Sequence, residues 1–296
     1  MNLRFVEAFI WVARLQSVTR AAEKLCLTQS AVSSRISSLE DELGVPLLDR
    51  RDRHFRLTHA GSRFLVYAHR LIDIQHELKE EIGTPEPQSI TLRLGAIETV
   101  LHTWLIPLID YLRASKPHIK FELTVEMTPM VAEQLRRGSI DLAFAAIPVQ
   151  AEGIRSEAVP SQEMVFVGCR EAVAGRSWSL EEIAENELLT FQRGSQPHVA
   201  LVDKLRAAGL ETTRIHTVSS ISALIRLVEG GLGFATLPQE VATRLCSKTA
   251  AFAILDSDVR LAPLPLHASY WLNPGVPQLD QAVRDAIAFV REQSVV

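Results

Sequence analysis

The sequence predicts a chain of two unlike parts, an all-helical N-terminal part and a larger α/β part. Three observations support this prediction. Apolar residues recur at spacings of three and four up to residue 82, two prolines and a glycine interrupt the chain within 83–89, and strand-like and helix-like segments alternate from residue 90 onwards. The chain has 296 residues, 47% hydrophobic and 22% charged, which is typical of a globular protein of two or three domains.

The composition argues against several classes of protein. Charged residues interrupt every apolar stretch before it reaches the roughly 20 residues that a membrane helix needs, so we expect no integral membrane protein. The first residues include Glu7 and no long apolar run, so we expect no secretory signal and a cytoplasmic location. Cys26, Cys169 and Cys246 are far apart, which predicts neither a disulfide framework nor a zinc site.

The first 58 residues predict three short helices and a small hairpin. A first helix is followed by a second over 20–25, with Thr19 as its expected N-cap, and by a third over 29–43, with Thr28 as its N-cap. Two short helices joined by a tight turn, the second beginning with polar side chains, are typical of a helix-turn-helix. Alternating residues over 47–57 predict a wing after it.

A long helix is predicted over 59–82, followed by a hinge over 83–89. Its apolar stripe approximates a coiled-coil seam and consists of Phe64, Ala68, Leu71, Leu78 and Ile82. A three-helix domain is too small to cover the whole stripe, so pairing with the same helix of a second subunit is favoured, while packing on its own domain stays open.

Charge is distributed unevenly along the chain. Residues 1–70 hold 11 Lys and Arg against 7 Asp and Glu, a net +4, whereas the remainder holds 20 against 28, a net −8. Four arginines fall within seven residues of the predicted wing: Arg50, Arg51, Arg53 and Arg56. Such a density suits a phosphate backbone, although charge alone leaves a solvated basic turn equally open.

The α/β part predicts two similar lobes. Strands are expected over 90–97, 120–126, 141–146, 163–169, 188–191, 214–218, 233–237 and 267–272, and helices over 100–114, 129–137, near 180, over 198–208, 221–229 and 279–293. The last strand and helix return to the first unit. We therefore expect a winged helix-turn-helix over 1–58, a linker helix over 59–82, lobe 1 over 90–160 and 266–296, and lobe 2 over 161–265, with the lobes facing across a cleft.

The chain resembles the LysR-type transcriptional regulators over nearly its whole length. The matching stretches are SVTRAAEKLCLTQSAVSSRISSLEDELGVPLL (17–48), Leu57-Thr58-x-Ala60-Gly61, GSIDLA (138–143) and GLGFATLP (231–238). The resemblance implies a periplasmic-binding-protein-like effector domain and binding of promoter DNA by the N-terminal domains. It also implies a small-molecule effector in the cleft and a homodimer through the linker helix, commonly assembled into a homotetramer.

The first turn of the third helix holds the expected base contacts, because a recognition helix presents that turn to the major groove. The candidates are Thr28, Gln29, Ser30, Ser33, Ser34 and Arg35, with Arg50, Arg51 and Arg53 of the wing on phosphates. Gln29 is the strongest candidate, since an amide can pair with adenine. The chain departs from the family pattern at Ser34, where the family usually has arginine, and at Leu48, where it usually has phenylalanine.

The effector site is expected where strands end and helices begin. The candidates at three such junctions are Glu98, Thr99, Thr128, Ser219 and Ser220, and those in a later loop are Gln192, Arg193 and Ser195. In the family the positions of Thr99 and Thr128 commonly line the pocket. The helix starts and Arg193 suit a carboxylate, whereas Glu98 suits an amine or hydroxyl, so the effector stays open. Each hydroxyl also has an ordinary alternative as a helix cap.

No nucleophile elbow, zinc-protease motif or Walker loop is present, and the nine histidines show no metal-ligand spacing. We therefore expect no enzyme, cofactor or metal. The favoured interpretation is a ligand-responsive regulator that binds DNA. A cytoplasmic small-molecule-binding module that uses its N-terminal region only for oligomerisation is the alternative, and an enzyme in the α/β part is a third.

Overall fold

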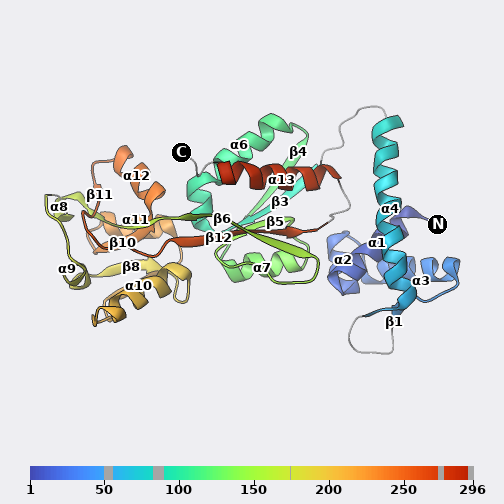
Figure 1. The fold of residues 1–296 in the computed structure, drawn as a ribbon, viewed down its shortest axis with the longest axis horizontal. Coiled ribbons are helices and arrows are strands. Elements are labelled where there is room, and N and C mark those ends of the chain that lie inside the picture. The colour runs from blue at the N-terminus through green and yellow to red at the C-terminus, as the bar shows by residue number, and fades with distance from the viewer. Residues whose placement is uncertain (50–55, 83–89, 174, 273–276, 293–296) are drawn as a thin grey trace.

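The structure, a computed structural model, describes residues 1–49, 56–82, 90–173, 175–272 and 277–292 (Figure 1). Its N-terminal domain begins with helices α1 (Leu3–Leu15), α2 (Val18–Lys24) and α3 (Gln29–Leu43). The Thr28 hydroxyl accepts a hydrogen bond from the Ala31 amide at 3.2 Å, so the predicted cap of α3 is confirmed. The predicted cap of α2 is wrong, because Ser17 caps it by accepting from the Arg20 amide, and Thr19 lies inside the helix.

The predicted wing begins and ends in a short antiparallel pair, β1 (Leu48–Asp49) and β2 (Arg56–Leu57). Helix α4 (His59–Ile82) follows directly. Thr58 joins the two, because its hydroxyl donates to the carbonyl of Pro46 and accepts from the amide of Gly61. Gly61 lies so close to the wing that a Cβ there would overlap the Leu47 carbonyl oxygen.

The apolar side chains of α4 are buried near the start of the helix and exposed further along it. Ala68 is fully buried, and Phe64 is half-buried against Phe9 of α1, with 5.2 Å between ring centroids. These two residues therefore pack on their own domain, the alternative that the sequence left open for this helix. Further along α4, Ile74 and Leu78 are exposed, and Figure 1 shows this end of the helix standing clear of the other helices.

Lobe 1 is built on a five-stranded sheet in the order β4-β3-β5-β12-β6. Its strands are β3 (Ile90–Ala96), β4 (Ile119–Val125), β5 (Leu142–Ala145), β6 (Ile154–Gln162) and β12 (Leu264–Trp271). Its helices are α5 (Glu98–Val100), the π-helix η1 (Leu101–Leu105), α6 (Ile106–Ser115), α7 (Thr128–Arg136) and α13 (Pro277–Glu292). In Figure 1, α6 and α13 lie on one side of the sheet and α7 on the other.

Lobe 2 repeats this plan with its own sheet, β11-β7-β10-β8-β9. Its strands are β7 (Met164–Cys169), β8 (Leu188–Phe191), β9 (Ile215–Val218), β10 (Phe234–Pro238) and β11 (Phe252–Ile254). Its helices are α8 (Arg170–Val173), α9 (Leu180–Ala184), α10 (Gln196–Ala207), α11 (Ile221–Glu229) and α12 (Gln239–Lys248). In each sheet three neighbouring strands are parallel, namely β4, β3 and β5 in lobe 1 and β9, β8 and β10 in lobe 2. The other two strands of each sheet pair antiparallel with their neighbours.

The chain crosses between the lobes twice, from β6 into β7 and from β11 back to β12. Strand β6 was not predicted, because its sequence IRSEAVPSQ is polar and contains a proline. An edge strand tolerates both features, and β6 lies at the edge beside β12. Helices α8 and α12 and strand β11 were also not predicted, since α8 and β11 are very short and only two residues of α12 are buried.

The N-terminal domain is docked on lobe 1 through two cationic side chains. The Lys24 ammonium lies 3.1 Å from the Asp141 carboxylate, and the two side chains are only 8% and 10% exposed. The Arg14 guanidinium lies over the ring of Trp271 and donates to the Leu272 carbonyl at 2.9 Å. We call these five residues the docking interface.

An apolar core extends across the docking interface. It joins residues of α1, such as Phe9 and Leu15, to Leu135 and Ile140 of lobe 1 and to Trp271. Burial lowers the pKa of Lys24, and lowers that of Arg14 to about 10, while the Asp141 carboxylate acts in the opposite direction on both. The two cations are therefore largely shielded from water, and the Asp141 carboxylate stabilises their charged forms.

Candidate nucleic-acid interface and effector site

Helix α3 presents its first turn to solvent. Its apolar side, Val32, Ile36 and Leu39, is buried in the N-terminal domain. Of the candidate DNA contacts on this helix and its cap, Thr28, Gln29, Ser30 and Ser34 are exposed, and Ser33 and Arg35 are half-buried. The amphipathic pattern thus turns the polar N-terminal residues outwards, as a recognition helix requires.

The candidates differ in how their groups are already used. The Thr28 hydroxyl caps α3 and lies 3.0 Å from the Ser30 hydroxyl, so the local structure already occupies it. Gln29 is exposed at the first position of the helix. Of the wing arginines, Arg56 is exposed in β2, whereas Arg50, Arg51 and Arg53 lie outside the described residues.

Between the lobes, Glu98 joins the start of α5 in lobe 1 to the start of α11 in lobe 2. The Ser220 hydroxyl donates to Glu98 Oε1, and the Ile221 amide donates to Glu98 Oε2, both at 3.0 Å. His102 Nε2 lies 3.6 Å from Glu98 Oε1. Burial alone would raise the pKa of Glu98, but nearby His102 and the hydrogen bonds from the Ile221 amide and the Ser220 hydroxyl together hold it below its ordinary value.

The hydroxyls at these junctions were predicted to bind the effector, with helix capping as the alternative, and in the structure Thr99, Thr128 and Ser220 do not cap their helices. Thr99 lies inside α5, Thr128 is the first residue of α7 and accepts from the Ala146 amide at 3.4 Å, and Ser220 donates to Glu98. The unpaired amide at the start of α11 is satisfied instead by Glu98, a residue from the other lobe.

The remaining predicted effector residues lie on lobe 2. Ser219 is exposed beside Ser220. Gln192 and Arg193 are exposed in the loop before α10, and Ser195 caps that helix by accepting from the His198 amide at 3.4 Å. Burial, followed by the charge of Arg193, lowers the pKa of His198. The structure therefore brings Glu98 and Ser220 into contact, with Thr99 beside Glu98 in the chain.

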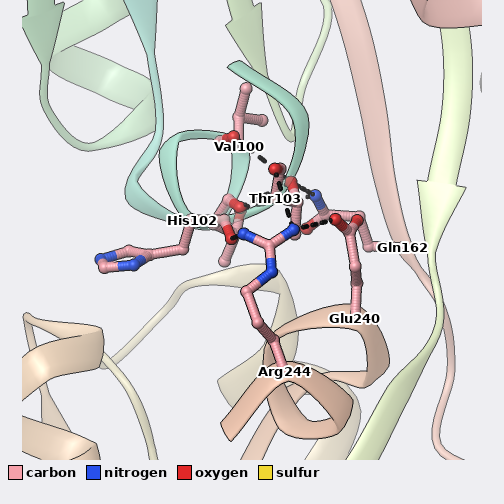
Figure 2. Close-up of polar contacts among 7 residues, drawn as sticks. Val100, His102, Thr103, Gln162, Glu240 and Arg244 are labelled. Atoms are coloured by element: carbon pink, nitrogen blue, oxygen red, sulfur yellow. Dashed lines mark hydrogen bonds and ion pairs between the residues drawn. The ribbon is translucent and has the colours of Figure 1, made fainter. Parts of the chain in front are cut away.

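A buried polar cluster on lobe 1 includes Thr103 and Gln162 (Figure 2). The Thr103 hydroxyl donates to the Thr99 carbonyl at 2.9 Å and lies 2.6 Å from Gln162 Nε2, which is itself 3.5 Å from the same carbonyl. Thr99 is 4% and Gln162 9% exposed, yet the Thr99 hydroxyl and the Gln162 side-chain oxygen have no hydrogen-bond partner. Such unpaired buried groups mark a place suited to a ligand or a water molecule.

Helix α12 of lobe 2 holds the π-helix η1 of lobe 1 through Arg244. Pro107 has no N–H, so it cannot bond to the carbonyl of Thr103 four residues earlier. Figure 2 shows the Arg244 guanidinium reaching that carbonyl at 3.4 Å and the carbonyl of His102 at 3.1 Å, while it also donates to Glu240 at 2.6 Å. This is a second polar connection between the lobes, beside the one at Glu98.

Two family models match the chain. The model described as "Bacterial regulatory helix-turn-helix protein, lysR family" matches residues 3–62, and "LysR substrate binding domain" matches residues 85–294. The chain belongs to the LysR family of transcriptional regulators. It is therefore a DNA-binding regulator with an effector-binding domain, and the expectation that it is not an enzyme is confirmed.

Individual LysR regulators resemble the chain over most of its length. The HTH-type transcriptional regulator DgdR of Burkholderia cepacia is 29% identical over 266 residues, which are 90% of this chain and 85% of that protein. BenM of Acinetobacter baylyi is 27% identical over 267 residues, 87% of each chain.

Solved structures of similar proteins share the fold. A full-length OxyR variant from Pseudomonas aeruginosa has a TM-score of 0.63 at 21% identity and covers 98% of this chain and 95% of its own. CbnR complexed with its target DNA has a TM-score of 0.55 at 23% identity and covers 97% of this chain and 100% of its own.

Some residues of this LysR regulator were not predicted as part of the site. Arg244, Gln162 and Thr103 escaped notice because their contacts join distant parts of the chain. One signal was present in the sequence, since Pro107 inside a helical pattern frees a carbonyl that another group must satisfy. Across the described ranges, no three His, Cys, Asp or Glu side chains gather to hold a metal ion, and no helix is long and apolar enough to cross a bilayer.

Proposed function

We propose that this cytoplasmic LysR regulator reads promoter DNA with the first turn of α3 and contacts the backbone phosphates with the arginines of the wing. The observation that carries the proposal is the exposure of Gln29 at the N-terminal end of a well-capped helix whose opposite side is buried. The base contacts are assigned to Gln29, Ser30, Ser33, Ser34 and Arg35, and the phosphate contacts to Arg50, Arg51 and Arg53.

The effector is proposed to bind between the lobes, beside Glu98, Thr99 and Gln162. Unpaired polar atoms at this place support a ligand site. A ligand there would strengthen or break the contacts that Glu98 and Arg244 make with the opposite lobe, and so change the balance between lobe arrangements. Because the N-terminal domain is docked on lobe 1, a movement of lobe 1 relative to lobe 2 would also change the position of α3.

A second copy of this chain is proposed to cover the free side of α4. Tyr67, Ile74 and Leu78 recur at spacings of seven and four, which places them along one side of the helix, and all three are exposed. Ile74→Glu should convert the dimer into a monomer in sedimentation experiments, whereas Ser62→Glu, at an exposed position of the same helix, should not. A monomeric wild-type chain at micromolar concentration would overturn this assignment.

DNA binding is tested by fluorescence anisotropy with the DNA upstream of the chain's own gene, at two salt concentrations. Gln29→Ala should weaken specific binding by about 1–3 kcal/mol, because an amide pair with a base discriminates by that amount. Ser38→Ala is the matched control, since Ser38 is exposed on the same helix but lies further from its start. Equal affinity for Gln29→Ala and wild type would remove Gln29 from the interface.

The phosphate contacts have their own readout. The triple variant Arg50→Ala, Arg51→Ala, Arg53→Ala should flatten the plot of log K against log salt, because each lost phosphate contact removes about 0.9 from the slope. An unchanged slope contradicts the wing assignment. Complete absence of DNA binding at low salt would favour the alternative, a small-molecule-binding module that uses its N-terminal region for oligomerisation.

A further inference from the structure

A cavity lies on lobe 2, between helix α10 and the segment 255–263 that carries the chain from β11 back to β12. Residues 260–262 line it on one side, and α10 lines it on the other through Gln196, Val199, Ala200, Asp203 and Lys204. Its volume is about 610 Å³. Small-molecule sites occupy roughly 300–1,000 Å³, so the cavity has room for a compound of metabolite size.

This cavity lies away from the proposed effector site. In the strand order β10-β8-β9, the crossover from β8 through α10 to β9 runs in the opposite direction to the crossover from β9 through α11 to β10. Because such crossovers are right-handed, α10 and α11 cover opposite faces of the sheet, as Figure 1 shows. Glu98 contacts the start of α11, so a ligand in the cavity would bind on the other face of lobe 2.

The cavity has an apolar part. The five lining residues of α10 follow one another at helical spacings of three and four, which places them along one side of the helix, whereas Leu201 and Leu205 on the other side are buried in the core of lobe 2. Val199 is 41% exposed although it is apolar, and Leu261 faces the cavity from the segment 255–263. A ligand with an apolar body would cover Val199 and gain from its removal from water.

Three charged side chains line the cavity, and none of them has a hydrogen-bond or ion-pair partner in the described part of the chain. They are Asp203, Lys204 and Arg260, so two cations stand against one acid, a net +1. Asp258, two residues before Arg260, is exposed and forms no ion pair with it. Since no acid neutralises Lys204 or Arg260 at contact distance, both can donate charge-assisted hydrogen bonds to a bound anion.

We propose that this cavity is a second ligand site, which takes a small organic anion with an apolar body. Lys204 and Arg260 would bind the anionic group, and Val199 and Leu261 would contact the apolar body. The segment 255–263 is one of the two crossings between the lobes, so an anion held between it and α10 would favour one arrangement of the lobes. The site goes beyond the proposed function and does not depend on what binds beside Glu98.

The test uses the full chain and isothermal titration calorimetry with two anions, hexanoate and cyclohexanecarboxylate, and their neutral counterparts 1-hexanol and cyclohexylmethanol. Wild type should bind at least one anion about tenfold more tightly than the matched alcohol and than acetate, which lacks the apolar body. The double variant Lys204→Gln, Arg260→Gln should weaken that anion about tenfold, and Asp203→Asn should tighten it about twofold. Raising the salt from about 0.05 M to about 0.5 M should weaken it too, because exposed cations are screened.

A control double variant, Arg206→Gln with Lys248→Gln, removes the same charge from exposed positions outside the cavity and should bind as wild type does. All of these changes are at exposed or half-buried positions, and the melting temperature without ligand checks that each variant folds. Wild type that binds neither anion, or binds the alcohols equally well, overturns the proposal. An anion that the cavity double variant still binds with wild-type affinity lies elsewhere and overturns it as well, and so does a control variant that loses as much affinity as the cavity variant.

Discussion

Asp141→Asn should strongly destabilise the docked N-terminal domain. Asp141 faces the buried Lys24 ammonium and also accepts from the Arg93 amide at 3.0 Å. At 3.1 Å and an effective dielectric constant near 20, the attraction lost is about 5 kcal/mol. Measured costs of removing one partner from a buried pair are about 3–5 kcal/mol, because the other charge stays buried. We expect a loss in that range in the free energy of unfolding.

Two variants make this prediction specific. In the double variant Lys24→Met, Asp141→Asn no charge is left buried, so most of the lost stability should return. The matched control is Asp285→Asn, whose partner Lys116 lies 2.9 Å away, with side chains 25% and 26% exposed. That half-exposed pair should contribute only about 0–1 kcal/mol.

Urea denaturation followed by tryptophan fluorescence measures all three variants, and Trp11 lies beside the Lys24 ammonium at 4.9 Å from its ring centroid. The pKa of Lys24 is already lowered by burial, so loss of its proton is one route by which the chain can reduce the cost. Asp141→Asn that costs no more than Asp285→Asn, or a double variant no more stable than the single one, would refute the reasoning.

Two further variants test packing and charge elsewhere. Gly61→Ala should lower the free energy of unfolding, measured by urea denaturation, by about 1–3 kcal/mol, because its Cβ would overlap the Leu47 carbonyl. A loss below about 0.5 kcal/mol would show that the wing shifts to make room for the Cβ. The Tyr270 hydroxyl, and then Arg291, lower the pKa of Glu157 against the effect of burial. The Glu157 carboxylate therefore stabilises the fold above pH 4.5, and this stabilisation is lost as the pH falls below 4.5. Glu157→Gln should therefore lower the melting temperature at pH 7 and flatten its decline below pH 4.5, and a decline as steep as that of wild type would contradict this.

The sequence predicted the elements whose signals are local. Signals from neighbouring residues determine the cap of α3 by Thr28, the start of α4 after Thr58 and most strands of both sheets. A single sequence shows such signals. It also predicted that the first turn of α3 faces outwards, as a recognition helix requires, and Gln29 and Ser30 are exposed there. Strand β6 escaped because its stability comes from pairing with β12, about a hundred residues later in the chain.

The site was predicted in part, for the same physical reason. Glu98 and Ser220 were both candidates, but each was assigned to a ligand or to its own helix, and the two in fact bind each other across 122 residues. Arg244 donates to the carbonyls of η1 from 142 residues further along the chain, so no local sequence pattern predicts this contact. The Ser220 hydroxyl was predicted to bind the effector or to cap α11, and a carboxylate from another segment caps that helix instead.

The apolar core shared by α1 and lobe 1 has a practical consequence for anyone who divides this regulator. A fragment of the first 82 residues would carry Leu15 and Trp11 away from the surface that covers them, and it would leave Lys24 without Asp141. The severed effector half would likewise uncover Trp271. Both truncated pieces should therefore aggregate more readily than the intact polypeptide, and results obtained on either half describe a molecule that has lost one of its contact surfaces.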